Sequence, residues 1–253
     1  MRPRLDLLAL AVLALQALTA CLAPSPGEAV GPDLGAFTLV LVSEGEGTGG
    51  SDRFGARGVF ERHRAFLEQE AEAGRLLVSG PFVQARSAQR GLLVFDLEDP
   101  DDVAQVLAGD PAVSAGLLRP EFYPLVTLGS LRDLPGMEQQ RVRASGGEGG
   151  DSRRFLVVMV EDGQSAIEAL QHPSIAPTVL VLGQLGEPSP GGLFAILDLE
   201  SAGELSARRR IAGPVAQTGR GAWRVWEWFS TPALEGFAFG GVAPQPPSSS
   251  ASK

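Results

Sequence analysis

The sequence is short of residue types that binding and catalytic sites often use. Lysine occurs once, at Lys253, cysteine occurs once, at Cys21, and there are only two histidines. A single cysteine excludes an intramolecular disulfide, and two histidines with one cysteine cannot build a typical zinc site. The Gly-rich segments 44–50 and 146–150 lack the lysine of a phosphate-binding loop and its strand–glycine–helix setting. We therefore expect no metal and no cofactor.

The chain also lacks an excess of positive charge. Its formal net charge is -9 over 253 residues. Nucleic-acid-binding proteins usually carry a basic surface, so we expect no nucleic-acid partner. Hydrophobic residues make up 44% of the sequence, which is ordinary for a globular protein and argues against a disordered chain.

The N-terminus has the features of a secretory signal. Two arginines precede the uncharged apolar run 7–18, which is shorter than the roughly 20 residues that span a membrane. Residues 18–21 read Leu-Thr-Ala-Cys, which resembles the lipobox of bacterial lipoproteins. The resemblance implies cleavage before Cys21, its lipidation, and attachment to the cell envelope. Leu22 follows instead of an aspartate, which favours the outer membrane, facing the periplasm. A plain signal peptide with an incidental cysteine is the alternative.

Composition predicts the order of domains along the chain. Pro-, Gly- and Ser-rich stretches separate two segments rich in apolar residues. The predicted parts are a signal peptide (1–20), a tether (21–35), a first domain (36–130), a linker (131–153), a second domain (154–232) and a disordered tail (233–253).

Both domains show the same order of predicted elements, β-α-β-β-α-β. The first has strands at 37–42, 76–79, 91–95 and 121–128, with helices from about 56 to 73 and at 99–107. The second has strands at 155–160, 179–183, 191–198 and 223–229, with a helix at 199–209. We interpret this order as an internal duplication in an α+β protein.

Six pieces of the first domain resemble the YCII-related family in order and spacing: His63, 74–77, 79–81, 91–95, 110–116 and the closing strand. The resemblance covers about residues 37–126. It implies a ferredoxin-like fold whose members pair two sheets into an α/β barrel. Here the second domain would supply the partner sheet within the chain, as an intramolecular pseudo-dimer. A single four-stranded sheet with helices on one face needs such a cover on the other.

The resemblance also implies a His and an Asp that meet in a cleft. By motif these are His63 and Asp110. Members of the family are thought to be enzymes, and some relatives are associated with breakdown of chlorinated aromatic compounds. The second domain departs from the pattern, because Ala166 stands at the histidine position and Gly213-Pro214 replaces the Asp-Pro. We therefore expect at most one active cleft per chain.

A His63/Asp110 pair could act on a small organic molecule without a cofactor. Asp110 would orient the imidazole, and the free ring nitrogen would serve as general base or acid. The structural alternatives are a satisfied histidine on an apolar helix face and an aspartate that caps a helix beginning at Pro111. The rival function is a non-catalytic envelope binding or interaction module that kept the fold.

Three further residues are candidate substrate contacts by position. Ser79 lies within the same motif, and Arg75 and Tyr123 are candidates by their positions in the chain. A serine at the end of a strand equally fits a turn, so this alternative stays open for Ser79.

Overall fold

The structure of the protein is a computed structural model. It describes residues 34–49, 53–83, 88–146, 152–161, 163–170, 175–199 and 223–236. The predicted signal peptide, Cys21, nearly all of the predicted helix at 199–209 and the residues after 236 lie outside this range. The start of the predicted disordered tail (233–253) is wrong, because residues 232–236 form a 3-10 helix with Ala233 and Leu234 buried. Within the described residues, no helix is both long and apolar enough to cross a membrane.

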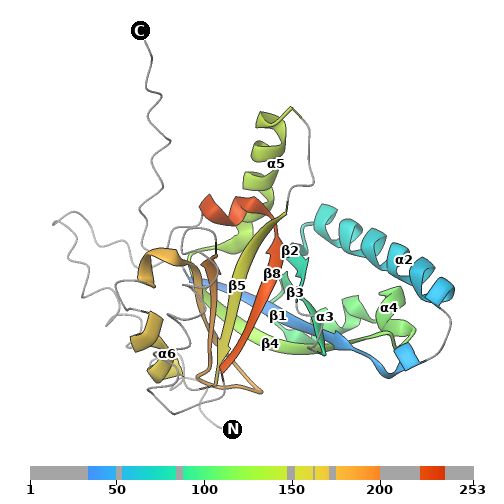
Figure 1. Ribbon diagram of the computed structural model, residues 1–253, viewed down its shortest axis with the longest axis horizontal. Coiled ribbons are helices and arrows are strands. Elements are labelled where there is room, and N and C mark those ends of the chain that lie inside the picture. Colours follow the sequence, from blue (N-terminus) through green and yellow to red (C-terminus); the bar gives the residue numbers. More distant parts are fainter. Residues whose placement is uncertain are drawn as a thin grey trace. The chain divides into compact units, whose positions relative to one another are not determined.

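Eight strands form one sheet in which every pairing is antiparallel (Figure 1). They are β1 (Leu34–Glu44), β2 (Leu76–Pro81), β3 (Gln89–Phe95), β4 (Leu118–Leu128), β5 (Arg153–Val160), β6 (Val179–Leu185), β7 (Leu193–Asp198) and β8 (Trp223–Ser230). Their order across the sheet is β2-β3-β1-β4-β6-β7-β5-β8. We call β1 to β4 the first half and β5 to β8 the second half.

Helices and 3-10 turns connect the strands. The helices are α2 (Arg53–Glu72), α3 (Pro100–Leu107), α4 (Pro111–Ser114), α5 (Leu134–Ala144) and α6 (Gly163–Leu170). The 3-10 turns are η1 (Glu46–Gly49), η2 (Leu131–Asp133), η3 (Ala176–Thr178) and η4 (Pro232–Gly236). Gly74 follows α2 with φ of +73°, a conformation that favours glycine after the end of a helix.

Two helices of the first half begin in the same way. Asp99 precedes α3 and Asp110 precedes α4, and each carboxylate accepts a hydrogen bond from the backbone N–H two residues later. A proline occupies the first helical position in both, where its missing N–H costs nothing. This arrangement fixes the backbone at Asp110 beside the sheet.

The sheet curves until its two edge strands meet, which makes it nearly a closed barrel. Phe82, directly after β2, forms an antiparallel bridge with Trp228 of β8. The Val83 N–H donates to the Glu227 carbonyl at 2.9 Å. A Cβ at Gly80 would collide with the Phe229 carbonyl and lie 2.7 Å from Trp228 Nε1. A residue without a side chain is therefore required where β2 approaches β8.

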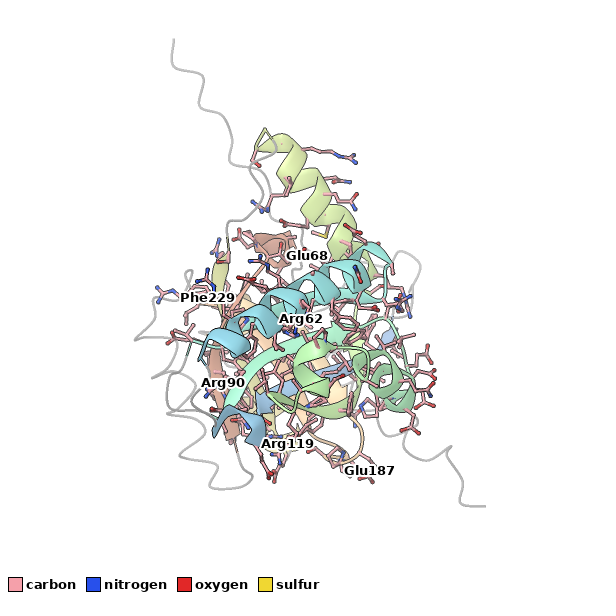
Figure 2. All side chains as sticks on the ribbon, turned by 90° about the vertical axis from the view of Figure 1, so that its right-hand side faces the viewer. Arg62, Glu68, Arg90, Arg119, Glu187 and Phe229 are labelled. Carbon is pink, nitrogen blue, oxygen red and sulfur yellow. The ribbon has the colours of Figure 1, made fainter. Side chains whose placement is uncertain are left out.

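The two faces of the sheet bury different apolar clusters, because successive side chains of a strand point to opposite faces. The inner cluster combines both halves and includes Phe37, Leu39, Tyr123, Phe155, Phe194, Trp226 and Trp228. The helix-side cluster belongs to the first half and includes Val40, Val42, Leu93, Phe95, Val103, Leu107 and Leu118, with Phe66 and Leu67 of α2 packed against it. Figure 2 shows α2 across this face, with Arg62 and Glu68 among its side chains.

Several predicted boundaries need correction. Helix α2 begins at Arg53 instead of near residue 56, and β4 begins at Leu118 instead of residue 121. The predicted linker 131–153 contains η2 and the eleven-residue helix α5. The Gly-rich end of that segment dominated the prediction, whereas residues 137–144 contain no glycine or proline and are compatible with a helix.

Candidate functional site

His63 lies on the face of α2 that is turned toward the sheet. Helical spacing puts Phe60, three residues before it, and Leu67, four residues after it, on the same face. The Phe60 ring stands edge-on to the imidazole, with 6.3 Å between ring centroids and 85° between the planes. The His63 side chain is 18% exposed, so it is shielded but still open to a small molecule.

Asp110 is the hydrogen-bonding partner of His63. His63 Nδ1 lies 2.7 Å from Asp110 Oδ2, and the Asp110 side chain is only 1% exposed. The other carboxylate oxygen, Oδ1, accepts from the Ala112 N–H at 2.9 Å. One residue thus serves both as helix cap and as partner of the histidine. An ionised carboxylate can only accept, so Nδ1 is the donor in this contact, and in the neutral imidazole the lone pair is then on Nε2.

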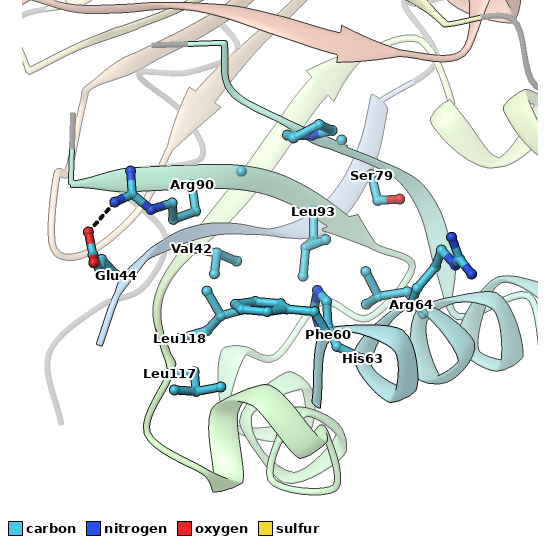
Figure 3. A pocket seen from close by; sticks show the side chains of 14 residues that line it. Val42, Glu44, Phe60, His63, Arg64, Ser79, Arg90, Leu93, Leu117 and Leu118 are labelled. Carbon is cyan, nitrogen blue, oxygen red and sulfur yellow. Dashed lines mark hydrogen bonds and ion pairs between the residues drawn. The ribbon is translucent and has the colours of Figure 1, made fainter. Parts of the chain in front are cut away.

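A pocket of about 350 Å³ lies between α2 and the strands of the first half. Its walls are mostly apolar, and His63 and Ser79 are among the residues that line it (Figure 3). The lining residues are Val42, Glu44, Phe60, His63, Arg64, Leu67, Ser79, Gly80, Pro81, Arg90, Gly91, Leu93, Leu117 and Leu118. Asp110 is not among them, and it contacts His63 through Nδ1 from outside the pocket lining. The volume is at the lower end of the range for small-molecule sites, about 300–1,000 Å³.

The polar side chains of the pocket divide between its two ends. In Figure 3 the Glu44–Arg90 ion pair lies at one end. Ser79 and Arg64 lie toward the other end, and Arg64 extends from α2 toward the strand that carries Ser79. His63 lies between them with Phe60 and Leu93. A molecule in the pocket would therefore meet apolar walls along its length and different polar groups at its ends.

Arg75 and Tyr123 do not line this pocket. Arg75 donates two hydrogen bonds to Glu70, at 2.6 and 2.9 Å, and this bonding raises the pKa of Arg75 above its ordinary value. Tyr123 is 3% exposed in the inner cluster, on the opposite face of the sheet, and its hydroxyl donates to Glu121 at 3.2 Å. Of the predicted site residues, the structure brings together His63, Asp110 and Ser79.

Four lining residues with charged or aromatic side chains, Phe60, Arg64, Glu44 and Arg90, were not predicted as site residues. Phe60 and Arg64 flank His63 on α2, and Glu44 pairs with Arg90 from β3 across the sheet. The helical spacing of Phe60 and His63 was a usable signal for the first of them. No sequence signal connects Glu44 with Arg90, because their pairing depends on the register between β1 and β3. Among the described residues, no group of three His, Cys, Asp or Glu side chains could hold a metal ion.

These features define an α+β protein with a curved antiparallel sheet. A His–Asp pair lies beside a small pocket in its first half. Residues 55–121 match the model of the YCII-related domain, and this segment contains both His63 and Asp110. No curated protein matches the chain.

Two solved structures of chlorite dismutase mutants from Candidatus Nitrospira defluvii are similar in fold. A doubly substituted mutant has a TM-score of 0.47 and 14% sequence identity, with 83% of this chain and 98% of that chain covered. A singly substituted mutant has a TM-score of 0.46 and 14% identity, with 82% and 96% covered.

Proposed function

We propose that the first half binds a small organic molecule in the pocket beside α2 and that His63 acts on it as a general base and acid. The observation that carries this proposal is the 2.7 Å contact between His63 Nδ1 and the buried Asp110 Oδ2, made by a histidine that also lines the pocket. Asp110 holds the Nδ1–H tautomer, so Nε2 is the nitrogen available to accept a proton. No part of this chemistry requires a cofactor.

The proton transfer itself is simple. Nε2 removes a proton from a carbon next to a carbonyl group, and the electron pair is delocalised onto the carbonyl oxygen as an enolate. The imidazolium that forms is stabilised by the Asp110 carboxylate. The same proton is then returned elsewhere on the substrate, or to a group that leaves in an elimination. Mostly apolar walls favour this chemistry, because they limit water around the transferring proton.

The experiment follows hydrogen–deuterium exchange, which can be measured on simple ketones and keto acids whatever the natural substrate is. The full chain is incubated in D₂O with pyruvate, acetoacetate, levulinate or cyclohexanone, and loss of the proton signal next to the carbonyl is followed by NMR. We expect exchange with the wild type on at least one compound, and about 100-fold slower exchange with His63→Gln, the usual size of general acid–base effects. Exchange that persists in a folded His63→Gln protein would contradict the proposal.

A second function, non-catalytic binding, is favoured by a different observation. Most of the pocket lining is apolar, and apolar burial alone can hold a small molecule. A protein that binds one of these compounds at the pocket and promotes no exchange would be a binding module, as expected of an envelope protein that transports or senses a ligand.

The finer arrangement that supports this function is a pseudo-dimer of two ferredoxin-like halves within one chain, with folded domains at 36–130 and 154–232. Its support is a constant difference in residue number between the two places where the halves pair, β2 with β8 and β4 with β6, which we call the seams of the sheet. Phe82 pairs with Trp228 at one seam and Leu185 with Leu125 at the other, and 185 − 82 and 228 − 125 both equal 103.

Hydrogen bonds repeat at the same spacing. The Val83 N–H donates to the Glu227 carbonyl, and the Gly186 N–H donates to the Pro124 carbonyl at 2.8 Å, with partners again 103 positions apart. Each half also shows the same relative strand order, 2-3-1-4. A repeated register of this kind is what duplication followed by packing of one copy on the other would produce.

The proposal places this pseudo-dimer in the bacterial envelope, attached to a membrane through a lipid on Cys21. Its support is the sequence Leu-Thr-Ala-Cys after an apolar run, together with the composition of the segment between Cys21 and the start of β1 at Leu34, which suits a spacer. Mass spectrometry of protein purified from a bacterial host would test it. A diacylglyceryl group on Cys21 is expected, and Cys21→Ser should abolish it and leave the protein unattached.

A further inference from the structure

The charged side chains around the pocket indicate the chemical class of its ligand, which the acid–base proposal leaves open. The pocket has three side chains that are or can become cationic, His63, Arg64 and Arg90, and one carboxylate, Glu44. That carboxylate is already engaged by Arg90. Asp110 lies 2.7 Å from His63. Arg64 is the remaining cation of the lining, and its neighbouring carboxylate, Glu68, lies 3.7 Å away.

Arg64 lies toward one end of the pocket. The Glu44–Arg90 pair neutralises the opposite end, while Arg64 and Ser79 share the end that Figure 3 shows on the side of β2. A serine hydroxyl donates a hydrogen bond, and a guanidinium offers a fork of donors that suits a carboxylate. Between this end and the ion pair, the pocket is walled by Val42, Phe60, Leu93 and Leu118.

The bonding of Arg64 leaves its guanidinium suited to a ligand. Arg64 Nε lies 3.7 Å from Glu68 Oε1, one helical turn on, and both side chains are mostly exposed. This separation is longer than a hydrogen bond, and exposed pairs of this kind contribute little energy. A carboxylate held against the pocket wall by apolar contacts would be a better partner than Glu68.

We infer that the pocket takes a small carboxylic acid with an apolar body, whose carboxylate lies between Arg64 and Ser79 and whose body passes under Phe60 beside His63. This inference rests on the proposed function only in using the same pocket. The acid group sets the orientation of the ligand, so that carbons near the carboxylate lie beside the histidine. Arg64 and Ser79 determine ligand class, and neither takes part in the proton transfer.

Three probes with the same carbon skeleton separate charge from apolar binding: cyclohexanecarboxylate, cyclohexylmethanol and cyclohexylmethylamine. Each is titrated into the full chain at pH 7.5, and the ring resonances of His63 are followed by NMR. The chain has only two histidines, so His63→Gln assigns the signals. We expect the carboxylate to bind at least tenfold more tightly than the alcohol, and the amine to bind most weakly.

The variant Arg64→Gln removes the charge, and the chain offers a closely matched control. Arg57 also lies on α2 and makes an exposed ion pair one turn on, with Glu61 at 3.2 Å, but it does not line the pocket. Arg64→Gln should weaken carboxylate binding about tenfold and leave alcohol binding unchanged. Arg57→Gln should change neither, whereas Ser79→Ala should weaken carboxylate binding by a smaller factor.

Several outcomes would overturn the inference. These are equal binding of the three probes, no carboxylate-dependent shift of His63, and equal effects of Arg57→Gln and Arg64→Gln, which would indicate only a general surface charge. The test is independent of catalysis. Selective carboxylate binding by a protein that promotes no deuterium exchange would support this inference and contradict the acid–base proposal, and exchange without acid selectivity would do the reverse.

Discussion

The two halves of the sheet share their strand order and differ in the helix that follows the first strand. Helix α2 of the first half has 20 residues, and α6 of the second half has eight. The YCII-related match is confined to residues 55–121 in the first half, which carries the His63–Asp110 pair. In the second half Ala166, 103 positions after His63, is fully buried.

This difference separates what the sheet needs from what the pocket needs. The two halves pair with each other at both seams, Phe82 with Trp228 and Leu125 with Leu185, so the curved sheet depends on both halves. The pocket depends on α2 and on side chains that only the first half has. We therefore expect substitutions at the seams to change stability in either half, and substitutions at the His–Asp pair to change activity in the first half alone.

The largest effect is expected at the seam between β2 and β8. Gly80→Ala would drive a Cβ into the Phe229 carbonyl, where backbone must move. We expect a loss of about 3 kcal/mol in the free energy of unfolding, the upper part of the range for overpacking. Urea denaturation followed by circular dichroism measures it.

Substitutions of two other glycines serve as comparisons for Gly80→Ala. A Cβ at Gly183, 103 positions later at the other seam, would lie 2.7 Å from Leu125 Cδ1 and 2.9 Å from the Val126 carbonyl, so Gly183→Ala should also destabilise, but less. A Cβ at Gly136 in α5 would meet nothing within 4 Å, and Gly136→Ala should be neutral or stabilising by up to about 1 kcal/mol. A Gly80→Ala protein as stable as Gly136→Ala would disprove the tight seam.

The next largest loss of stability is expected at Asp110. Comparing it with Asp99 separates the contribution of the His–Asp contact from that of a helix cap. Asp99 and Asp110 both cap a helix that begins with proline, but only Asp110 also bonds a histidine. Asp99→Ala should destabilise the protein by about 1 kcal/mol, the usual effect of losing a cap. Asp110→Ala should destabilise it by about 2–3 kcal/mol, because the buried bond to His63 is lost as well.

Asp110→Asn then separates stability from function. Its amide oxygen can still cap α4, but its NH₂ group cannot accept from His63 Nδ1. We expect this variant to be more stable than Asp110→Ala and to lose deuterium exchange nearly as completely as His63→Gln. If Asp99→Ala and Asp110→Ala were equally destabilising, the histidine contact would contribute nothing to the fold.

The sequence predicted the order of the elements better than it predicted the contacts between them. Strand periodicity located all eight strands, because apolar β-rich runs bounded by Gly and Pro are strong local signals. The meeting of His63 and Asp110, 47 residues apart, came from a family resemblance and not from local spacing. Asp110 fitted two interpretations, and both hold, since each carboxylate oxygen has its own partner.

Contacts between strands that are distant in the chain could not be predicted from the sequence. The sequence predicts a strand that ends at Ser79, yet β2 continues to Pro81, and Gly80 is where the second half closes the sheet. Tyr123 was placed near the site by its position in the chain, but strand alternation turns it to the inner face. Which face is inner depends on register and closure, which no single segment of sequence encodes.

The smallest change in stability is expected in α5, within the segment that joins the two halves, and this change depends on pH. Glu138 of α5 accepts from Arg141 at 2.7 and 2.9 Å and also from Thr231 at the end of the second half. The hydrogen bond from Arg141 is the main reason that the pKa of Glu138 is lowered, against a smaller opposing effect of partial burial. A glutamate in an unfolded chain has a pKa of about 4.3. The stabilisation is therefore fully present above about pH 4.3 and is lost as the pH falls through the lower, folded-state pKa.

Glu138→Gln should accordingly destabilise the protein at pH 7 by less than about 1 kcal/mol, since the pair is partly exposed. The difference from wild type should shrink as the pH is lowered below about 4. Urea midpoints measured from pH 7 to pH 3 for the wild type, Glu138→Gln, Arg141→Gln and the double variant test this, because the coupling between the two residues should fade over the same pH range. A difference that grows toward low pH would mean that Glu138 is more easily protonated in the folded chain, and that its link between α5 and the second half does not stabilise the junction.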